Sequence, residues 1–162
     1  MELCGAKTGS FGSIWNKEEE AEKLLIGTYQ HNIDSKGRVF VPVKLRADLG
    51  DRFIVSKGLD GCLFVYSVEE WKRLEDEIRN LPFSQSRQIQ RFLFAGASEA
   101  EVDSQGRVCV PQILREYAGL DKEVTIIGAC SRAEIWSRSR WEGECSEITP
   151  DAIAEIMEKL NF

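Results

Sequence analysis

The sequence predicts an α+β protein, mainly β, in which two tandem half-units pair about a pseudo-two-fold axis and close one shared barrel. Two observations lead to this fold class. A string of ten residues occurs twice, as IDSKGRVFVP at 33–42 and as VDSQGRVCVP at 102–111. Each copy is followed by similar short runs, and neither has enough alternating strand length to bury its own apolar face. The second copy therefore supplies the missing half of the core.

The repeat extends well beyond this string. At an offset of 69 residues the copies match at many positions, from Asp34 with Asp103 to Arg46 with Arg115. After one inserted residue the match continues to the end of the second copy. Two versions of one unit thus fill residues 25–141.

Each unit is expected to contain the same elements in the same order. A strand ends in a polar turn, where Gly37 or Gly106 can adopt the positive φ of a tight hairpin. A second strand follows the turn, and Pro42 or Pro111 then opens a short helix that ends at a glycine. Two further strands, bounded by glycine or polar residues, complete the unit.

Helices are expected between and after the two units. A cap at Ser67 opens a helix that Pro82 stops, and a second helix covers about residues 84–95. At the C-terminus, Thr149 caps a helix of about three turns. Its apolar stripe consists of Ile153, Ile156, Met157 and Leu160. This stripe either packs on the core of its own chain or docks on a neighbouring subunit.

These elements divide the chain into five expected segments. They are a flexible N-terminal extension (1–23), a first half-unit (24–81), a connecting helix (82–98), a second half-unit (99–141), and an acidic segment with a helix (142–162). The first thirteen residues are small, polar and glycine-rich, a composition that disfavours packing.

The ends of the chain carry its net charge of −6. Residues 24–141 hold 17 basic and 16 acidic side chains, a balance of +1, whereas 142–162 hold one basic and six acidic. A basic face on the middle of the chain therefore stays possible, and the overall charge does not exclude a nucleic-acid partner. No run approaches the roughly 20 apolar residues of a membrane span. We expect a cytoplasmic protein without a membrane partner.

The sequence predicts no catalytic site, no metal site and no cofactor. Five cysteines form no C-x-x-C pair, and the single histidine, His31, has no Ser or Cys partner at a recognisable spacing. We interpret Cys62, Cys109 and Cys130, which lie in apolar runs, as small buried hydrophobes. We do not expect an enzyme.

The two polar turns hold the candidate functional residues. Lys36 and Arg38 place two cations at the tip and rim of a solvent-exposed hairpin. In one interpretation Asp34 pairs with Arg38, and Asp103 with Arg107, as braces within the fold. In the other, the arginine bonds O6 and N7 of a guanine in the major groove, the lysine contacts a phosphate, and the aspartate holds the arginine extended. The residues alone leave both open.

The run GTYQHNIDSKGRVFVPVKLR at 27–46, with its shorter repeat DSQGRVCVPQILR at 103–115, resembles the MraZ family of bacterial transcriptional regulators. The resemblance spans about residues 24–141 and includes the Asp-x-x-x-Arg signature twice. It implies the AbrB-like swapped-hairpin barrel with both halves in one chain. It also implies a homo-oligomeric ring, often an octamer or a dodecamer.

The resemblance further implies a function. Members of the family bind G-rich tandem repeats in the promoter ahead of the division and cell-wall gene cluster, usually their own promoter, and mostly repress it. The expected partners are then double-stranded DNA and further copies of the chain, and the expected location is the nucleoid. The residues carried over as DNA-binding are Lys36, Arg38, Gln105 and Arg107, supported by Asp34, Gly37, Asp103 and Gly106.

The chain departs from the family pattern in two places. Gln105 stands where the first turn has Lys36, so the second turn has one positive charge fewer. Residues 1–23 precede the usual family start near Leu24, and we hypothesise a flexible extension or a start site assigned too far upstream. Two rival functions stay open: an antitoxin-like regulator of the wider AbrB group, and a protein-binding or structural ring without DNA readout.

Overall fold

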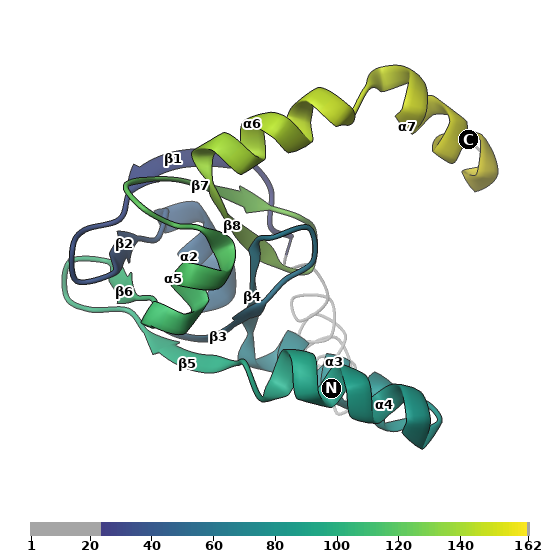
Figure 1. Ribbon diagram of the computed structural model, residues 1–162, viewed down its shortest axis with the longest axis horizontal. Helices are drawn as coiled ribbons and strands as arrows, with labels where there is room; N and C mark the ends of the chain where they lie inside the picture. The colour runs from purple at the N-terminus through teal and green to yellow at the C-terminus, as the bar shows by residue number, and fades with distance from the viewer. Residues whose placement is uncertain (1–23, 162) are drawn as a thin grey trace, which may run out of the picture.

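The structure is a computed structural model that describes residues 24–161, so the expected N-terminal extension lies outside the described residues. Eight strands and six α-helices occur among these residues, together with one π-helical and one 3-10 turn. The α+β class predicted from the sequence is confirmed. Figure 1 shows the strands gathered in one body from which two helical arms extend.

The two units contain the same elements in the same order, as the repeat predicts. The first unit consists of β1 (Thr28–Asn32), β2 (Arg38–Phe40), α2 (Val43–Leu49), β3 (Arg52–Lys57) and β4 (Leu63–Ser67). The second consists of β5 (Ser98–Glu101), β6 (Arg107–Cys109), α5 (Gln112–Ala118), β7 (Glu123–Gly128) and β8 (Ala133–Ser137). Both short helices end at a glycine with positive φ, 84° at Gly50 and 64° at Gly119.

The strands of the two units are interleaved. Six of them form an antiparallel sheet in the order β1-β7-β8-β4-β3-β5, and β2 pairs with β6 in a separate two-stranded ribbon. The first strand of each unit therefore pairs with the other unit: Gln30 lies opposite Thr125, and Ala100 lies opposite Phe53. Neither unit could satisfy these backbone hydrogen bonds alone, which explains why two copies are needed.

Two details of the predicted architecture are wrong. The described strands do not close a barrel, because β1 and β5 are the two edges of an open sheet. The polar turns also do not join paired strands. Beyond a single bridge between Ile33 and Val39, β1 and β2 leave the first turn toward different partners in the second unit. The exchange gives each strand a full-length partner, which a hairpin between β1 and the three-residue β2 would not.

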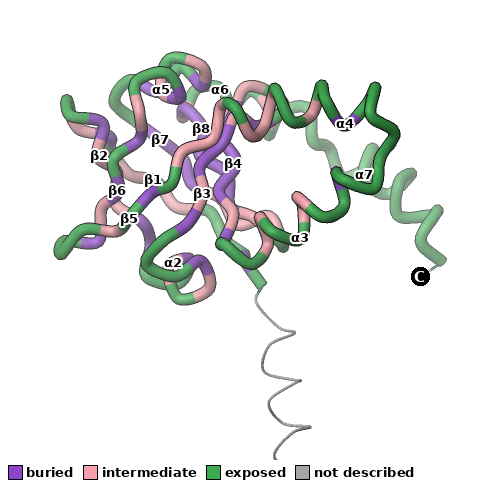
Figure 2. Tube along the Cα trace, turned by 90° about the horizontal axis from the view of Figure 1, so that it is seen from below, coloured by how far each residue is buried: buried purple, intermediate pink, exposed green. Residues whose placement is uncertain are grey.

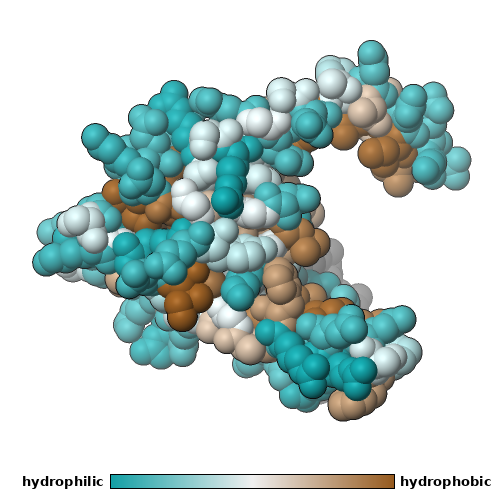
Figure 3. Space-filling model, viewed as in Figure 1, coloured by the Kyte–Doolittle hydropathy of each residue, from teal (hydrophilic) through white to brown (hydrophobic). Residues whose placement is uncertain are grey.

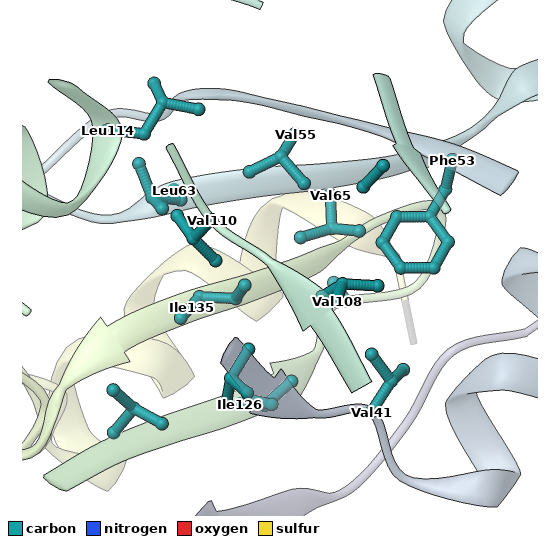
Figure 4. Packing of buried hydrophobic residues seen from close by; sticks show 14 of the residues in the cluster. Val41, Phe53, Val55, Leu63, Val65, Val108, Val110, Leu114, Ile126 and Ile135 are labelled. Atoms are coloured by element: carbon teal, nitrogen blue, oxygen red, sulfur yellow. The ribbon is translucent and has the colours of Figure 1, made fainter. Parts of the chain in front are cut away.

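The core lies between the sheet and the β2–β6 ribbon. Val39 and Val108 face each other at the centre of the ribbon, and each is 1% exposed. Figure 4 shows Val108 and Val41 close to Ile126, a side chain of β7. Burial of each such side chain contributes about 1.5–3 kcal/mol. The ribbon is thus fixed to the body by apolar packing from both units.

The first helical arm connects the two units. It consists of α3 (Val68–Arg79) and α4 (Phe83–Ile89), which continues into a π-helical turn, η1 (Gln90–Phe94). The Ser67 hydroxyl accepts a hydrogen bond from the backbone N–H of Glu70 at 3.2 Å, so the predicted cap is confirmed. Trp71 of α3 packs against Phe94 of η1, with ring centroids 4.7 Å apart.

The second arm follows β8 and ends the described chain. It consists of α6 (Arg138–Glu147), α7 (Pro150–Met157) and a 3-10 turn, η2 (Glu158–Leu160). Thr149 caps α7 through its hydroxyl, as predicted. Of the two interpretations of the α7 stripe, burial in the core of its own chain is not observed, because Ile153, Ile156, Met157 and Leu160 are all 39–60% exposed. The arm extends away from the body (Figure 1), which leaves docking on another chain as the remaining interpretation.

Only one of the three cysteines expected to be buried is buried. Cys62 is fully buried, and this burial raises the pKa of its thiol to about 12. Cys109 and Cys130 are exposed, contrary to the sequence prediction. Cys109 ends the short ribbon strand β6, and Cys130 lies in a tight turn with φ of 70°. No helix within residues 24–161 is long and apolar enough to cross a membrane.

Candidate nucleic-acid interface

The first turn is organised by the carboxylate of Asp34. Its Oδ1 accepts hydrogen bonds from the backbone N–H groups of Lys36 at 3.0 Å and Arg38 at 2.8 Å. Its Oδ2 accepts from Arg38 Nε at 2.7 Å. Gly37, with φ of 82°, closes the turn by donating its N–H to the Asp34 carbonyl. One carboxylate therefore sets both the backbone of the turn and the direction of its arginine.

The second turn has the same arrangement. Asp103 Oδ1 accepts from the backbone N–H groups of Gln105 and Arg107, both at 2.9 Å. Oδ2 accepts from Arg107 Nε at 3.2 Å, a longer contact than in the first turn. Gly106 has φ of 78° and donates its N–H to the Asp103 carbonyl.

These hydrogen bonds keep both aspartates ionised. The backbone N–H of Arg38 is the main cause that lowers the pKa of Asp34, against a smaller opposing effect of desolvation. The pKa of Asp103 is lowered in the same way, first by the backbone N–H of Arg107. A charged aspartate in each turn then holds its arginine by a charge-assisted bond at neutral pH.

The aspartates occupy only one edge of each guanidinium. Within residues 24–161, Arg38 and Arg107 bond their aspartates through Nε, and no other hydrogen bond of either guanidinium is found. The two side chains keep 34% and 29% of their surface exposed. The terminal Nη groups are therefore free to bind a ligand while the brace stays in place. The two interpretations of the turn are compatible in this geometry.

The two turns lie at opposite ends of the β2–β6 ribbon. Arg38 stands opposite Cys109, and Arg107 stands opposite Phe40. Each turn glycine also accepts a bond from the strand of the other unit, Val110 to Gly37 at 2.8 Å and Val41 to Gly106 at 2.9 Å. Figure 2 shows both exposed loops at the end of the molecule that faces away from the helical arms. The same end is mostly hydrophilic in Figure 3.

Two further arginines lie beneath the turns, and their position was not predictable from the sequence. Arg115 of α5 packs against Gly37, and Arg46 of α2 packs against Gly106, so each turn rests on the helix of the other unit. No ion pair or hydrogen bond to either guanidinium is found in the part of the chain that the structure describes. The matching position of both arginines in the repeat was the only signal available.

The remaining polar residues considered in the sequence analysis are His31, the possible metal ligands and the two residues at the tips of the turns. His31 packs against Phe40, with ring centroids 5.2 Å apart. No group of three His, Cys, Asp or Glu side chains that could hold a metal occurs among the described residues. Lys36 and Gln105 are both exposed at the tips of their turns, where they can contact a molecule bound to this end of the protein.

Comparisons with known proteins identify relatives of the chain over most of its length. A family model described as "MraZ protein, putative antitoxin-like" matches residues 24–91 and 93–158. The chain is 55% identical over 139 residues to a protein of Heliobacterium modesticaldum named transcriptional regulator MraZ, covering 85% of this chain and 96% of that one. It is 52% identical over 143 residues to the protein of the same name from Acetivibrio thermocellus, covering 86% and 100%.

Proposed function

The chain belongs to the MraZ family, and on that premise we propose that it is a sequence-specific DNA-binding regulator of transcription. The relatives named above carry the name transcriptional regulator. Their name supports a DNA-binding regulator, and the geometry of the turns supports the residues that bind. A role as a regulator requires no catalytic group.

One observation carries this proposal: each turn arginine is held by Nε, and its two Nη groups have no partner within residues 24–161. A guanine presents two acceptors, O6 and N7, in the major groove, and an arginine with two parallel N–H donors matches them. An arginine already held extended loses less conformational freedom on binding. We propose that Arg38 and Arg107 contact the bases. Lys36 and Gln105, beside them, are proposed to contact the sugar-phosphate backbone of the DNA.

The operator is proposed to consist of G-rich tandem repeats ahead of the division and cell-wall genes, including the promoter of this chain's own gene, and binding is proposed to repress them. Two reading turns at opposite ends of one ribbon suit a site in which the same bases recur. The protein then acts at the nucleoid.

A homo-oligomeric ring of eight or twelve copies is the proposed active form. The small positive balance of residues 24–141 allows one subunit only weak binding. Several subunits on repeated sites would add their contacts through effective concentration. The exposed apolar stripe of α7 is a surface that a neighbouring copy would cover.

The proposal is tested by fluorescence anisotropy with a labelled duplex from upstream of the gene and a shuffled duplex, at several salt concentrations. We expect wild-type protein to prefer the native duplex, and Arg38→Ala to lose at least tenfold in affinity for it. Arg73→Ala is the matched control, because Arg73 is an exposed arginine of α3 remote from the turns. Light scattering measures the number of copies in the same samples.

Equal binding of both duplexes by wild-type protein, or unchanged binding by folded Arg38→Ala, would contradict this function. The turn would then be only a brace of the fold. The protein-binding ring and the antitoxin-like regulator would become the leading candidates, and α7 the first surface to test.

A further inference from the structure

Arg115 lies directly beneath the first turn although it belongs to the second unit. A Cβ placed on Gly37 would lie 2.7 Å from Arg115 Nε and 2.8 Å from its Cζ, so the guanidinium is in contact with the turn backbone. The rest of the helix that carries it is fixed, because Leu114 and Ala118 are buried in the core. The position of the guanidinium is therefore set by the fold.

The guanidinium of Arg115 has no partner among the described residues. Its Nε is buried and makes no hydrogen bond, and no carboxylate pairs with it. A buried donor without an acceptor is costly, and native proteins seldom keep one without a reason. The turn arginines Arg38 and Arg107 each have a carboxylate partner. Arg46 beneath the second turn has none among the described residues, but it does not bury an unpartnered nitrogen as Arg115 does. The buried Nε is closed off by the turn, so a ligand would be bound by the terminal Nη groups, which also have no partner among the described residues.

A hollow of about 570 Å³ opens beside this guanidinium. Ser35 of the first turn and Gln112 and Glu116 of α5 line it together with Arg115. Ser35 is exposed at the tip of the turn and contributes a hydroxyl that donates or accepts a hydrogen bond. The hollow thus combines one cation and one hydroxyl, from opposite units, at the end face that carries the turn arginines.

Two carboxylates also line the hollow and restrict what it can bind. Glu116 accepts a hydrogen bond from Gln112 Nε2 at 2.9 Å, and the other carboxylate, Asp121, is exposed. Their charges oppose a multiply charged free anion more strongly than a singly charged one. A phosphodiester carries a single charge, and the groups that could bind it here are Arg115 and Ser35.

We propose that this hollow is a phosphate-binding subsite in which Arg115 and Ser35 bind one phosphate oxygen. The favoured source of the phosphate is the DNA backbone beside the base that Arg38 contacts, so the inference rests on the proposed function. Free inorganic phosphate offers the same chemistry, and the experiment separates the two sources. The subsite completes the first turn with a residue of the second unit.

The second turn supplies a matched control. Arg46 packs against Gly106 as Arg115 packs against Gly37, but its closest atom there is the terminal Nη1. Its Nε is not among the buried unpartnered atoms of the described chain. Positions 43 and 47 of α2 hold Val43 and Ala47 where α5 has Gln112 and Glu116. The surface beside the second turn is accordingly less polar.

The test compares Arg115→Gln, Ser35→Ala and Arg46→Gln with wild-type protein on the native and shuffled duplexes. Loss of one phosphate contact lowers the slope of log Kd against log salt by about 0.9 for each bound subunit. We expect Arg115→Gln to show this decrease and a fivefold or greater loss of affinity, with the ratio between native and shuffled duplex unchanged. Phosphate contacts carry no sequence information, so a preserved ratio separates this role from base reading. Ser35→Ala should shift the slope less, and Arg46→Gln should shift it less than Arg115→Gln.

A second arm uses protein without DNA. Melting temperatures are compared in inorganic phosphate and in chloride at equal ionic strength, for wild type and Arg115→Gln. A phosphate-dependent rise in wild type that is lost in the variant, with an unchanged DNA salt slope, assigns the hollow to free phosphate. If wild-type protein binds no DNA, the proposed function fails and this arm alone decides the subsite.

Unchanged salt slope and affinity in folded Arg115→Gln, together with no phosphate-dependent melting, overturn the inference. If Arg115→Gln does not fold, the exposed Ser35→Ala variant decides in the same assays. If Arg46→Gln and Arg115→Gln lower the slope of log Kd against log salt equally, the hollow beside Arg115 is not a distinct phosphate-binding subsite.

Discussion

The two turns share their internal hydrogen bonds but differ in what surrounds them. In both, one aspartate organises the backbone and holds the arginine by Nε. The first turn lies on Arg115 and beside Cys109, whose thiol donates to the Lys36 carbonyl at 3.4 Å. The second turn lies on Arg46 and beside the ring of Phe40.

This difference shows which part of the repeat is the same in both copies. Local geometry that directs the arginine is retained in both copies, whereas the tip and the supporting surface have diverged. Because the supports come from the opposite unit, a change in one unit acts on the turn of the other. The two turns should therefore tolerate substitution to different degrees and contribute unequally to DNA binding.

The largest expected difference concerns the two turn glycines. Alanine at either position is strained by the positive φ, at about 1–2 kcal/mol. At Gly37 a Cβ would also lie 2.8 Å from the backbone carbonyl of Val110, whereas at Gly106 its nearest neighbours belong to side chains, the movable end of Arg46 at 2.6 Å and the ring edge of Phe40 at 2.9 Å. We expect Gly37→Ala to lower the free energy of unfolding in urea by about 2–3 kcal/mol and Gly106→Ala by about 1–2 kcal/mol. Equal losses would show that the supports do not differ, and the reverse order would show that the second turn has the tighter support.

The aspartates provide the next largest effect. Asparagine keeps the size of the side chain and an oxygen for the turn backbone but removes the charge that holds the arginine. The Arg38 contact is 2.7 Å and the Arg107 contact 3.2 Å. We expect Asp34→Asn to weaken DNA binding by about tenfold and Asp103→Asn by about threefold, since a charge-assisted bond is roughly twice as strong as a neutral one. Anisotropy on the native duplex measures both, and a larger loss for Asp103→Asn would reverse the proposed ranking of the turns.

A smaller effect is expected at the tips. Lys36→Ala removes a positive charge, whereas Gln105→Ala removes none. Lys36→Ala should weaken binding by about twofold to fivefold and flatten its salt dependence, because fewer counterions are released. Gln105→Ala should leave the salt dependence unchanged. The same change in slope for both variants would contradict the asymmetry.

The smallest effect is expected from pH. The pKa of both aspartates is lowered on folding, so their contribution to stability is present above the unfolded value of about 3.9 and is lost as pH falls through the folded pKa. Thermal melting of wild type and of the Asp34→Asn/Asp103→Asn double variant should differ by a constant amount from pH 6 to 8. The gap should narrow as the pH falls below about 4. A gap that stays the same down to pH 3 would show that these carboxylates do not stabilise the turns through their charge.

The sequence predicts the local parts of this site well. The Asp-x-x-x-Arg turns, their glycines and the helix caps depend on neighbours within four residues, and each is where the residues indicate. The order of strands in each unit also follows from the repeat. These features can be predicted without knowing how distant parts of the chain pack together.

What the sequence did not predict depends on contacts between distant residues. Both units offer similar strand edges, so the pairing of β1 with β7 in place of β2 has no local signal. Cys109 lies in an apolar run, but it stands between Val108 and Val110, which both face the core, so the alternation along the strand turns Cys109 to the outer face. The position of Arg115 beneath the first turn follows from the exchange of strands, which sequence periodicity does not report.

The central claim is that Arg38 and Arg107 read bases and do not merely supply charge. The measurement that tests it most directly is the ratio of affinities for native and shuffled duplex with Arg38→Lys/Arg107→Lys, which keeps both charges but removes the planar pair of donors. We predict that the folded variant still binds DNA with a similar salt slope while its preference for the native duplex falls by tenfold or more. A preference equal to that of wild-type protein would contradict the account.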